Sequence, residues 1–322
     1  MSNKIPFKPA WWLPTSHLQT LWPTFCRRSI KNVVLRRERF ELPDGDFVDL
    51  DWIGKENGPI VLILHGLEGS IHSPYAKGML KAIEQQGWRG VFMHFRSCSG
   101  ERNRLPRTYH SGETGDVDVV ARTLRAREPS VPFGAIGFSL GGNVLLKWLG
   151  ETGDTNPLDA AIAISVPFEL YKAVERIRRG FSRVYQWHLL RCLRHKIDWK
   201  FREQSLPVPL PTLANLHSIH DFDDRVTAPL HGFSDAEEYY HKCSSRQYLN
   251  AIRVPTLVLQ SKDDPFMTQD LLPTQNELSP QVTLEITDKG GHVGFVTGHA
   301  PWRAKYWLEE RAPVFLREFL EA

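Results

Sequence analysis

Short apolar runs, each about as long as one buried strand, alternate along this chain with stretches of helical periodicity. Such near-continuous runs are typical of strands buried on both faces, as in a parallel sheet covered by helices. The segments 73–86, 114–127 and 143–150 carry the helical periodicity. The runs are IVLILH (60–65), GVFMHF (90–95), FGAIGF (133–138), AAIAIS (160–165), TLVLQS (256–261) and VTLEIT (282–287).

The residues before the first run show a different pattern. Segments 33–41 and 47–52 alternate polar and apolar residues and flank Asp44-Gly45, which predicts an antiparallel hairpin. A hairpin followed by parallel strand–helix units predicts the α/β-hydrolase fold, with a mostly parallel central sheet and helices on both of its faces.

The interval between the fourth and fifth runs is too long for a simple crossover. It spans roughly 90 residues, whereas most connections in α/β units are much shorter. We therefore expect residues of about 167–250 to form an inserted, mostly helical cap on a single domain that spans 1–322. Residues 1–30, rich in proline and aromatic side chains, are expected to form an irregular arm on the domain surface.

Composition narrows the class of protein. The 322 residues carry a net charge of only +3, so the whole molecule shows no sign of nucleic-acid binding. The four cysteines are scattered, which argues against a zinc site or a disulfide framework and fits a reducing compartment. No apolar leader follows the first lysines, and no run approaches the ~18 apolar residues of a membrane-spanning helix. We expect a cytoplasmic protein that needs no metal and no organic cofactor.

The third run ends in a motif that carries chemistry. Gly137-Phe138-Ser139-Leu140-Gly141 joins a buried strand to a helix through a turn so sharp that a side chain at either glycine would meet backbone. Such a turn raises the Ser139 hydroxyl above the edge of the sheet, beside the helix N-terminus. This is the geometry of a serine nucleophile in acyl transfer.

A serine hydroxyl needs a base and an acid, which on this fold follow it in the order acid and then histidine. The fifth run leads into Asp263 and Asp264, and the sixth leads into a glycine-rich loop with His292. We predict Asp264 as the acid, because Pro265 turns the chain directly after it, and Asp263 as a brace of the loop. His299 is the weaker candidate for the base, since it begins the next segment.

Two backbone N–H groups are predicted to form the oxyanion hole. One belongs to Leu67 in the loop after the first run, and the other belongs to Leu140, directly after the nucleophile. His65, at the end of the first run, is expected to order that loop by hydrogen bonding rather than to act in catalysis.

These motifs together resemble those of a known family. The sequence is similar to the YheT-like α/β hydrolases, the AB-hydrolase-4 family within the AB hydrolase superfamily, over nearly the whole chain. The resemblance implies a charge-relay triad on Ser139, Asp264 and His292, whereas Ser97 stands where the pattern has glycine. The matching strings are SHLQT (16–20), HGLEGS (65–70), HFRSCSGE (94–101), YHSGET (109–114), GFSLGGN (137–143), FDDRVTAPLHGFSDAEEYY (222–240), KDDPF (262–266) and GGHVGF (290–295).

The predicted function is that of a serine hydrolase that cleaves carboxylic esters, with short to medium acyl chains or in lipids, through an acyl-enzyme. Phe168, Phe181 and Trp187 in the cap suggest an apolar acyl group. One alternative is an acyltransferase with an alcohol acceptor, and another is a membrane-surface or partner-binding protein on a hydrolase scaffold. The membrane-surface alternative rests on the tryptophans of the arm and on segment 171–203. This segment contains ten Lys or Arg and only three Asp or Glu, so it could contact an anionic membrane.

Overall fold

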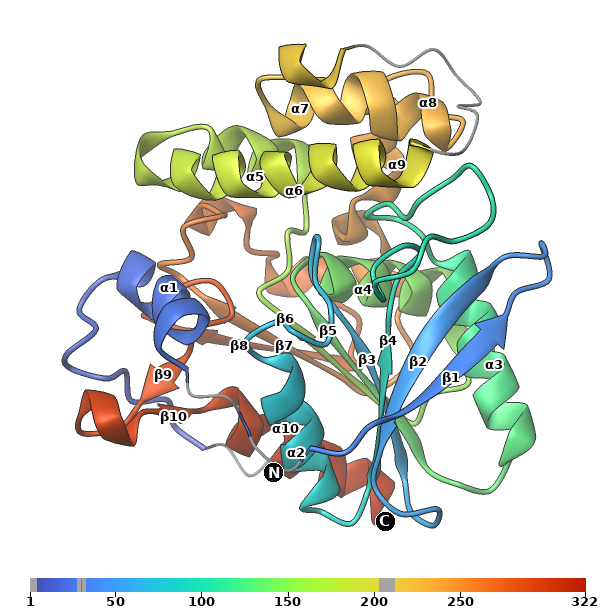
Figure 1. Ribbon diagram of the computed structural model, residues 1–322. Helices are drawn as coiled ribbons and strands as arrows, with labels where there is room; N and C mark the ends of the chain where they lie inside the picture. The colour runs from blue at the N-terminus through green and yellow to red at the C-terminus, as the bar shows by residue number, and fades with distance from the viewer. Residues whose placement is uncertain (1–4, 28–29, 31–32, 203–211) are drawn as a thin grey trace.

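A computed structural model describes residues 5–27, 30, 33–202 and 212–322. At its centre lies an eight-stranded sheet in the order β1-β2-β4-β3-β5-β6-β7-β8 (Figure 1). The β1–β2 hairpin and the β2–β4 pair are antiparallel, and the other neighbours run parallel. The strands are β1 (Arg36–Glu41), β2 (Phe47–Ile53), β3 (Ile60–Leu64), β4 (Arg89–Met93), β5 (Phe133–Phe138), β6 (Ala160–Ile164), β7 (Thr256–Ser261) and β8 (Val282–Thr287).

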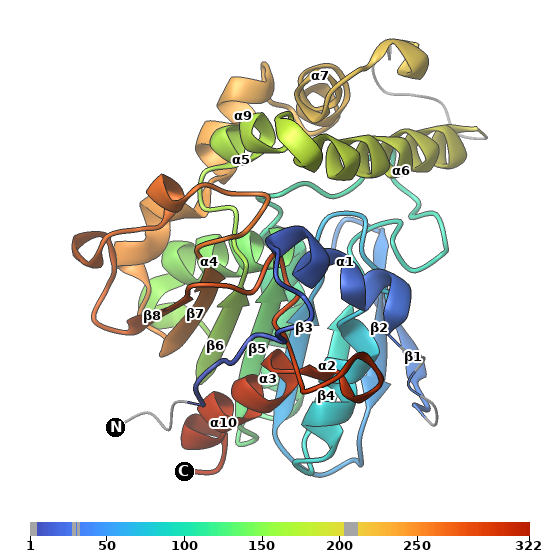
Figure 2. The same cartoon turned by 90° about the vertical axis from the view of Figure 1, so that its left-hand side faces the viewer.

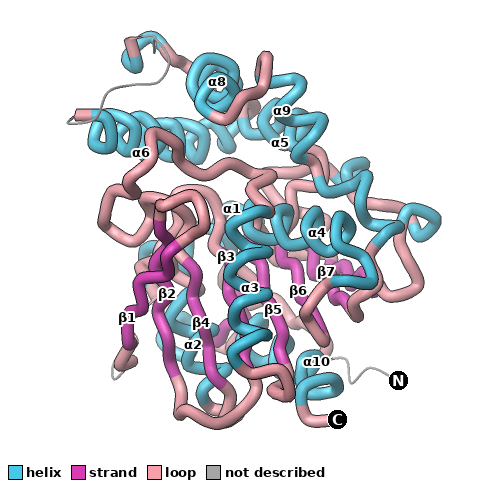
Figure 3. Tube along the Cα trace, turned by 90° about the vertical axis from the view of Figure 1, so that its right-hand side faces the viewer, coloured by secondary structure: helices cyan, strands magenta, loops and turns pink. Residues whose placement is uncertain are grey.

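Helices cover both faces of the sheet, which confirms the predicted fold class (Figure 3). Strands β3 to β7 are buried along their whole length, so each strand contributes alternate side chains to a core on either face. Helices α3 and α4 complete one core, and α2 and α10 complete the other. These helices are α2 (Ala76–Glu84), α3 (Gly115–Arg127), α4 (Leu140–Thr152) and α10 (Leu308–Leu320).

The long interval between β6 and β7 lies above the carboxyl ends of the strands as a layer of helices (Figure 1). We keep the name cap for residues 167–250, of which 203–211 lie outside the described residues. Its helices are α5 (Leu170–Ile177), α6 (Arg183–Phe201), α7 (Ile219–Phe222), α8 (Ala228–Leu230) and α9 (Ala236–Cys243), with a π-helical turn at Asp223–Thr227. Within the ranges described, no helix combines the length and the hydropathy that crossing a membrane requires.

The N-terminal segment contains a helix, whereas an irregular arm was expected over residues 1–30, of which 1–4, 28 and 29 are not described. Helix α1 (Ser16–Cys26) begins after Thr15, whose hydroxyl accepts the Leu18 N–H at 3.3 Å, and continues through Pro23. It packs on the small hairpin of β9 (Val296–Thr297) and β10 (Lys305–Tyr306). These tertiary contacts outweigh the low helix propensity of the proline and aromatic residues.

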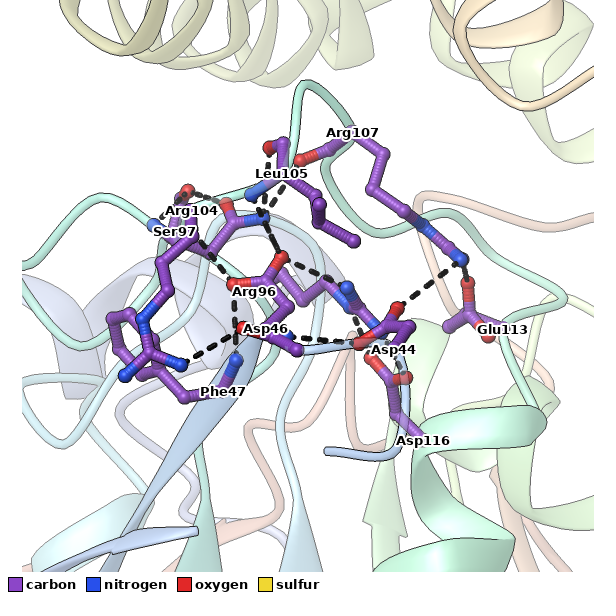
Figure 4. Close-up of polar contacts among 12 residues, drawn as sticks. Asp44, Asp46, Phe47, Arg96, Ser97, Arg104, Leu105, Arg107, Glu113 and Asp116 are labelled. Atoms are coloured by element: carbon purple, nitrogen blue, oxygen red, sulfur yellow. Dashed lines mark hydrogen bonds and ion pairs between the residues drawn. The ribbon is translucent and has the colours of Figure 1, made fainter. Parts of the chain in front are cut away.

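A buried ionic network fixes the loops beside the β1–β2 hairpin (Figure 4). The Arg96 guanidinium contacts the carboxylates of Asp44, Asp46 and Asp116 at 2.6–2.8 Å. Burial alone would lower the pKa of Arg96, but the carboxylates of Asp116 and Asp44 raise it above its usual value. The network thereby joins the hairpin turn, the loop after β4 and the start of α3.

The departure from the family pattern at Ser97 is accommodated in this loop. Ser97 has φ +62°, in the left-handed region that favours glycine. Its hydroxyl donates to the side-chain oxygen of Asn103, a hydrogen bond that glycine would lack. The same oxygen accepts a hydrogen bond at 2.7 Å from Lys200 of α6, so this loop also holds the cap.

Candidate active site

Ser139 lies in the turn between β5 and α4, with φ +52° and ψ −117°. A Cβ at Gly137 would lie 2.4 Å from the Gly141 carbonyl oxygen, and a Cβ at Gly141 would lie 2.4 Å from the Leu64 carbonyl oxygen. The turn therefore requires glycine at both positions. The Ser139 N–H donates to the Ile164 carbonyl at 2.8 Å, which fixes the turn to the neighbouring strand β6.

Three of the predicted site residues meet above the carboxyl ends of the strands. His292 Nε2 lies 2.9 Å from Ser139 Oγ, and His292 Nδ1 lies 2.9 Å from Asp264 Oδ2. Asp264 is only 3% exposed, and its other oxygen accepts the Phe266 N–H at 2.8 Å. The Phe266 ring stacks on the imidazole at 4.0 Å. The carboxylate and the ring together hold the imidazole with Nδ1–H toward Asp264 and Nε2 toward the hydroxyl.

Asp263 and His299, the other candidates for the acid and the base, have other contacts. Asp263 accepts the Gly291 N–H at 2.9 Å, so it holds the loop that carries His292. Burial raises the pKa of Asp263. His299 is exposed to solvent, and its backbone carbonyl accepts the Trp11 indole N–H at 3.0 Å.

His65 is fully buried behind the loop that follows β3. Its Nδ1 lies 2.7 Å from the Gly66 carbonyl, and its Nε2 accepts the Phe95 N–H at 3.1 Å. Burial lowers the pKa of His65 to about 3, so the imidazole is neutral near pH 7. The imidazole therefore ties the loop after β3 to the loop after β4, and among the described residues neither of its nitrogens bonds to Ser139.

The loop after β3 brings Leu67 to the cavity that Ser139 lines. Leu67, Leu140 and Ser139 line one cavity. The residues on either side of Leu67 donate their N–H groups to the hydroxyls of Tyr75, at 2.8 Å, and Tyr109, at 2.7 Å. These two bonds fix the backbone around Leu67.

A buried cluster joins this loop to the cap, and sequence reasoning missed it. The Lys196 ammonium of α6 lies 2.9 Å from Glu68 and 2.8 Å from Cys98 Sγ. Glu68 also accepts the Tyr109 hydroxyl at 2.9 Å. Burial would lower the pKa of Lys196, but Cys98 and Glu68 raise it above its usual value. The sequence feature that could have pointed to this cluster is the YHSGET string, which includes Tyr109.

Helix α1 supplies a second group of contacts that sequence reasoning did not assign. The His292 N–H donates to the Thr20 hydroxyl at 2.9 Å. The Gln19 side chain accepts the Val296 N–H at 2.7 Å and donates to its carbonyl at 3.2 Å. Both residues belong to the string SHLQT, whose role the sequence alone did not define.

Two cavities meet at Ser139 and His292. The first, of about 110 Å³, lies between the cap and the loops above the sheet, and the second, of about 470 Å³, lies between α1 and α6. Of the three cap aromatics, none lines the first cavity and Trp187 lines the second: Phe168 is buried in the core, and Phe181 and Trp187 are exposed. The apolar cap wall of the first cavity is formed instead by Leu170, Ala173, Val174, Ile177, Leu193 and Ile197.

Residues 59–299 match the family described as alpha/beta hydrolase fold. The chain belongs to this family. Over its full length it is 43% identical to "Putative esterase YheT" of Escherichia coli (strain K12), of which it covers 96%. This identity confirms the resemblance to the YheT-like group.

A more distant relative supports this membership, and a solved structure has a similar fold. The chain is 31% identical to phospholipase ABHD3 of Bos taurus, over 93% of this chain and 75% of that protein. The fold is similar to the structure of the Pyrococcus furiosus esterase Pf2001, with a TM-score of 0.61 and 18% identity over 91% of this chain and 96% of that one. Among the described residues, no three His, Cys, Asp or Glu side chains are grouped so as to hold a metal ion.

Proposed function

We propose that this α/β hydrolase cleaves carboxylic esters through an acyl-enzyme on Ser139. Its relatives, named as an esterase and a phospholipase, support the class of carboxylic ester hydrolase. The observation that carries the proposed mechanism is the position of His292, whose Nε2 lies 2.9 Å from Ser139 Oγ and whose Nδ1 lies 2.9 Å from Asp264 Oδ2.

In the proposed reaction, Ser139 Oγ attacks the carbonyl carbon of the ester while His292 Nε2 accepts the hydroxyl proton. The Asp264 carboxylate stabilises the imidazolium through its hydrogen bond to Nδ1–H. Collapse of the tetrahedral intermediate expels the alcohol, which takes the proton from His292. A water molecule, deprotonated by the same imidazole, then attacks the acyl-enzyme and releases the acid.

The backbone N–H groups of Leu67 and Leu140 are proposed to bind the oxyanion. Leu140 is the first residue of α4, where N–H groups have no acceptor within the helix and the helix dipole favours negative charge. Leu67 lines the same cavity, and the hydrogen bonds of its two neighbours fix the backbone there. Donors held in place in this way need no reorganisation when the charge develops.

The apolar walls of the first cavity favour an acyl group of short to medium length. Each methylene that leaves water for such a wall contributes about 0.8 kcal/mol to binding. A series of p-nitrophenyl esters of increasing acyl length is therefore expected to show kcat/KM rising with length until the cavity is filled.

The nucleophile is tested with Ser139→Ala in the full-length protein. Turnover of a short-chain p-nitrophenyl ester should fall by on the order of 10⁶-fold, and a fluorophosphonate probe should no longer label the protein. Ser130→Ala is the matched control, because Ser130 is exposed in the loop before β5, at the opposite edge of the sheet. An unchanged rate in Ser139→Ala would exclude this serine from the mechanism.

The acceptor of the acyl group is tested by product analysis in water that contains a small amount of alcohol. Free acid should be the main product. Predominant formation of the new ester at low alcohol concentration would contradict hydrolysis as the reaction and favour acyl transfer.

A further inference from the structure

The second cavity has an apolar rim that is exposed to solvent. Phe25 of α1 and Val184 and Trp187 of α6 line this cavity, and their exposed fractions are 77%, 47% and 61%. The same cavity is lined at its inner end by Ser139 and His292. The path from solvent to Ser139 therefore begins between apolar side chains that remain exposed to solvent.

The apolar surface continues beyond the rim on both helices. Leu18 is 44% exposed and lies two helical turns before Phe25, on the same side of α1. Phe181, just before α6, is 51% exposed, and its ring lies 4.6 Å from that of His17 in α1. Helix α1 lies below the start of α6 (Figure 2). Together these side chains form one surface, which we call the mouth face: Leu18, Phe25, Phe181, Val184 and Trp187.

Positive charge surrounds the mouth face. Arg179, Arg183 and Arg191 are exposed, and no carboxylate of the described residues lies within ion-pair distance of them. The Arg191 guanidinium lies 5.7 Å from the ring of Trp187. Arg178, by contrast, pairs with Glu175 of α5 and so adds no net charge beside the mouth face.

These features fit a lipid surface better than a small molecule in water. Tryptophan and phenylalanine side chains partition to the boundary between headgroups and acyl chains, and arginines attract anionic headgroups. We propose that the mouth face docks on an anionic phospholipid bilayer, so that a lipid ester passes from the membrane through the second cavity to Ser139. This inference rests on the proposed function for its substrate, and the docking itself is tested without catalysis.

The test is sedimentation of the full-length protein with vesicles of phosphatidylcholine alone or with 30% phosphatidylglycerol, at about 0.1 M salt. The protein should bind the anionic vesicles, and binding should weaken at high salt. Arg183→Glu combined with Arg191→Glu should weaken it by at least about 25-fold, since each cation near such a surface contributes about a fivefold change in affinity. Arg253→Glu is the control, because Arg253 is exposed just before β7, at the opposite end of the sheet.

The apolar part of the mouth face is tested with Leu18→Ser combined with Phe181→Ser, and Trp302→Ser is the control, because Trp302 is 73% exposed outside the mouth face. The double variant should bind anionic vesicles at least tenfold more weakly, and the control should bind as the wild type does. Neither Leu18 nor Phe181 lines a cavity that contains Ser139, so turnover of p-nitrophenyl acetate should stay unchanged.

Two results would overturn the docking. One is wild-type protein that binds anionic vesicles no better than neutral ones, and the other is a pair of mouth-face variants that bind as the wild type does while keeping turnover of the soluble ester. Failure of the proposed function has a different signature, since the wild type would then bind vesicles but leave p-nitrophenyl acetate intact.

Discussion

The ion pair between Lys196 of the cap and Glu68 of the loop after β3 gives the sharpest test of how the cap supports the candidate site. Both side chains are buried, with 12% and 8% of their surface exposed. Lys196→Met keeps most of the apolar volume of the side chain and removes its charge. The Glu68 carboxylate then keeps only its hydrogen bond from Tyr109.

The loss of stability can be bounded from this geometry. Removing one partner of a buried ion pair costs about 3–5 kcal/mol, because the other charge stays buried. A buried carboxylate without a partner can lose its charge by taking up a proton, which at pH 7 costs about 4 kcal/mol. The loss of stability therefore cannot exceed this cost. We therefore expect the free energy of unfolding to fall by about 3–4 kcal/mol. With an unfolding entropy of about 2.1 cal/mol/K per residue over 322 residues, Tm should fall by about 5 °C.

A double-mutant cycle measured by urea unfolding at pH 7 checks the reasoning. Glu68→Gln added to Lys196→Met should restore stability to within about 1 kcal/mol of the wild type, because no unpaired charge remains. Lys172→Met is the matched control in the cap: Lys172 pairs with Glu169 at 2.8 Å but is 49% exposed, so its loss should cost less than about 1 kcal/mol. Equal losses for Lys196→Met and Lys172→Met, or a double variant no better than Lys196→Met, would refute it.

Three further predictions follow from single residues. Asp264→Asn should lower kcat by about 10⁴-fold on a soluble ester with little change in Tm, because the imidazole loses the partner that fixes its tautomer. Gly141→Ala should lower the free energy of unfolding by about 1–3 kcal/mol in urea, because its Cβ would lie 2.4 Å from a backbone oxygen. Burial raises the pKa of Asp223 from 3.8 to about 6, so the folded state binds more protons between these values and stability should fall as pH rises through that range. Asp223→Asn should flatten this slope in urea unfolding at pH 4.5 and 7, and an unchanged slope would contradict it.

Local patterns were enough to predict the sheet and the turn at Ser139. Strands β3 and β5 to β8 each lie within one apolar run, and β4 begins one residue before its run, at Arg89. Burial on both faces, as in β3 to β7, requires almost every residue to be apolar. The glycines at 137 and 141 could be interpreted because any side chain there would meet backbone. The positions of Ser139, Asp264 and His292, each after a parallel strand, predicted that the three side chains lie close together, because the carboxyl ends of parallel strands share one edge of the sheet.

Contacts between distant segments could not be predicted in this way. Thr20 binds the backbone of His292 across 272 positions, and no local pattern relates the two. The direction of the cap aromatics depends on how α6 packs: Leu190 and Leu193 are buried in the apolar cluster of the cap, whereas Trp187, less than one turn before Leu190, is 61% exposed. The sequence shows that the cap contains aromatic side chains, but it does not show which way they point, because tertiary packing determines their direction.

The backbone strain around Ser139 shows why these distant contacts matter for the geometry of the candidate site. Among the described residues, Glu68, Ser139, Ser165 and Val293 all have φ between +52° and +59°, and they lie in loops that follow four different strands. Such conformations cost of order 1–3 kcal/mol each and persist only where neighbouring groups over-determine them. Ser165 accepts the Val293 N–H at 3.0 Å, so these loops hold one another. The loops around Ser139 are therefore held by one another and, through the ion pair of Glu68 with Lys196, by α6 of the cap.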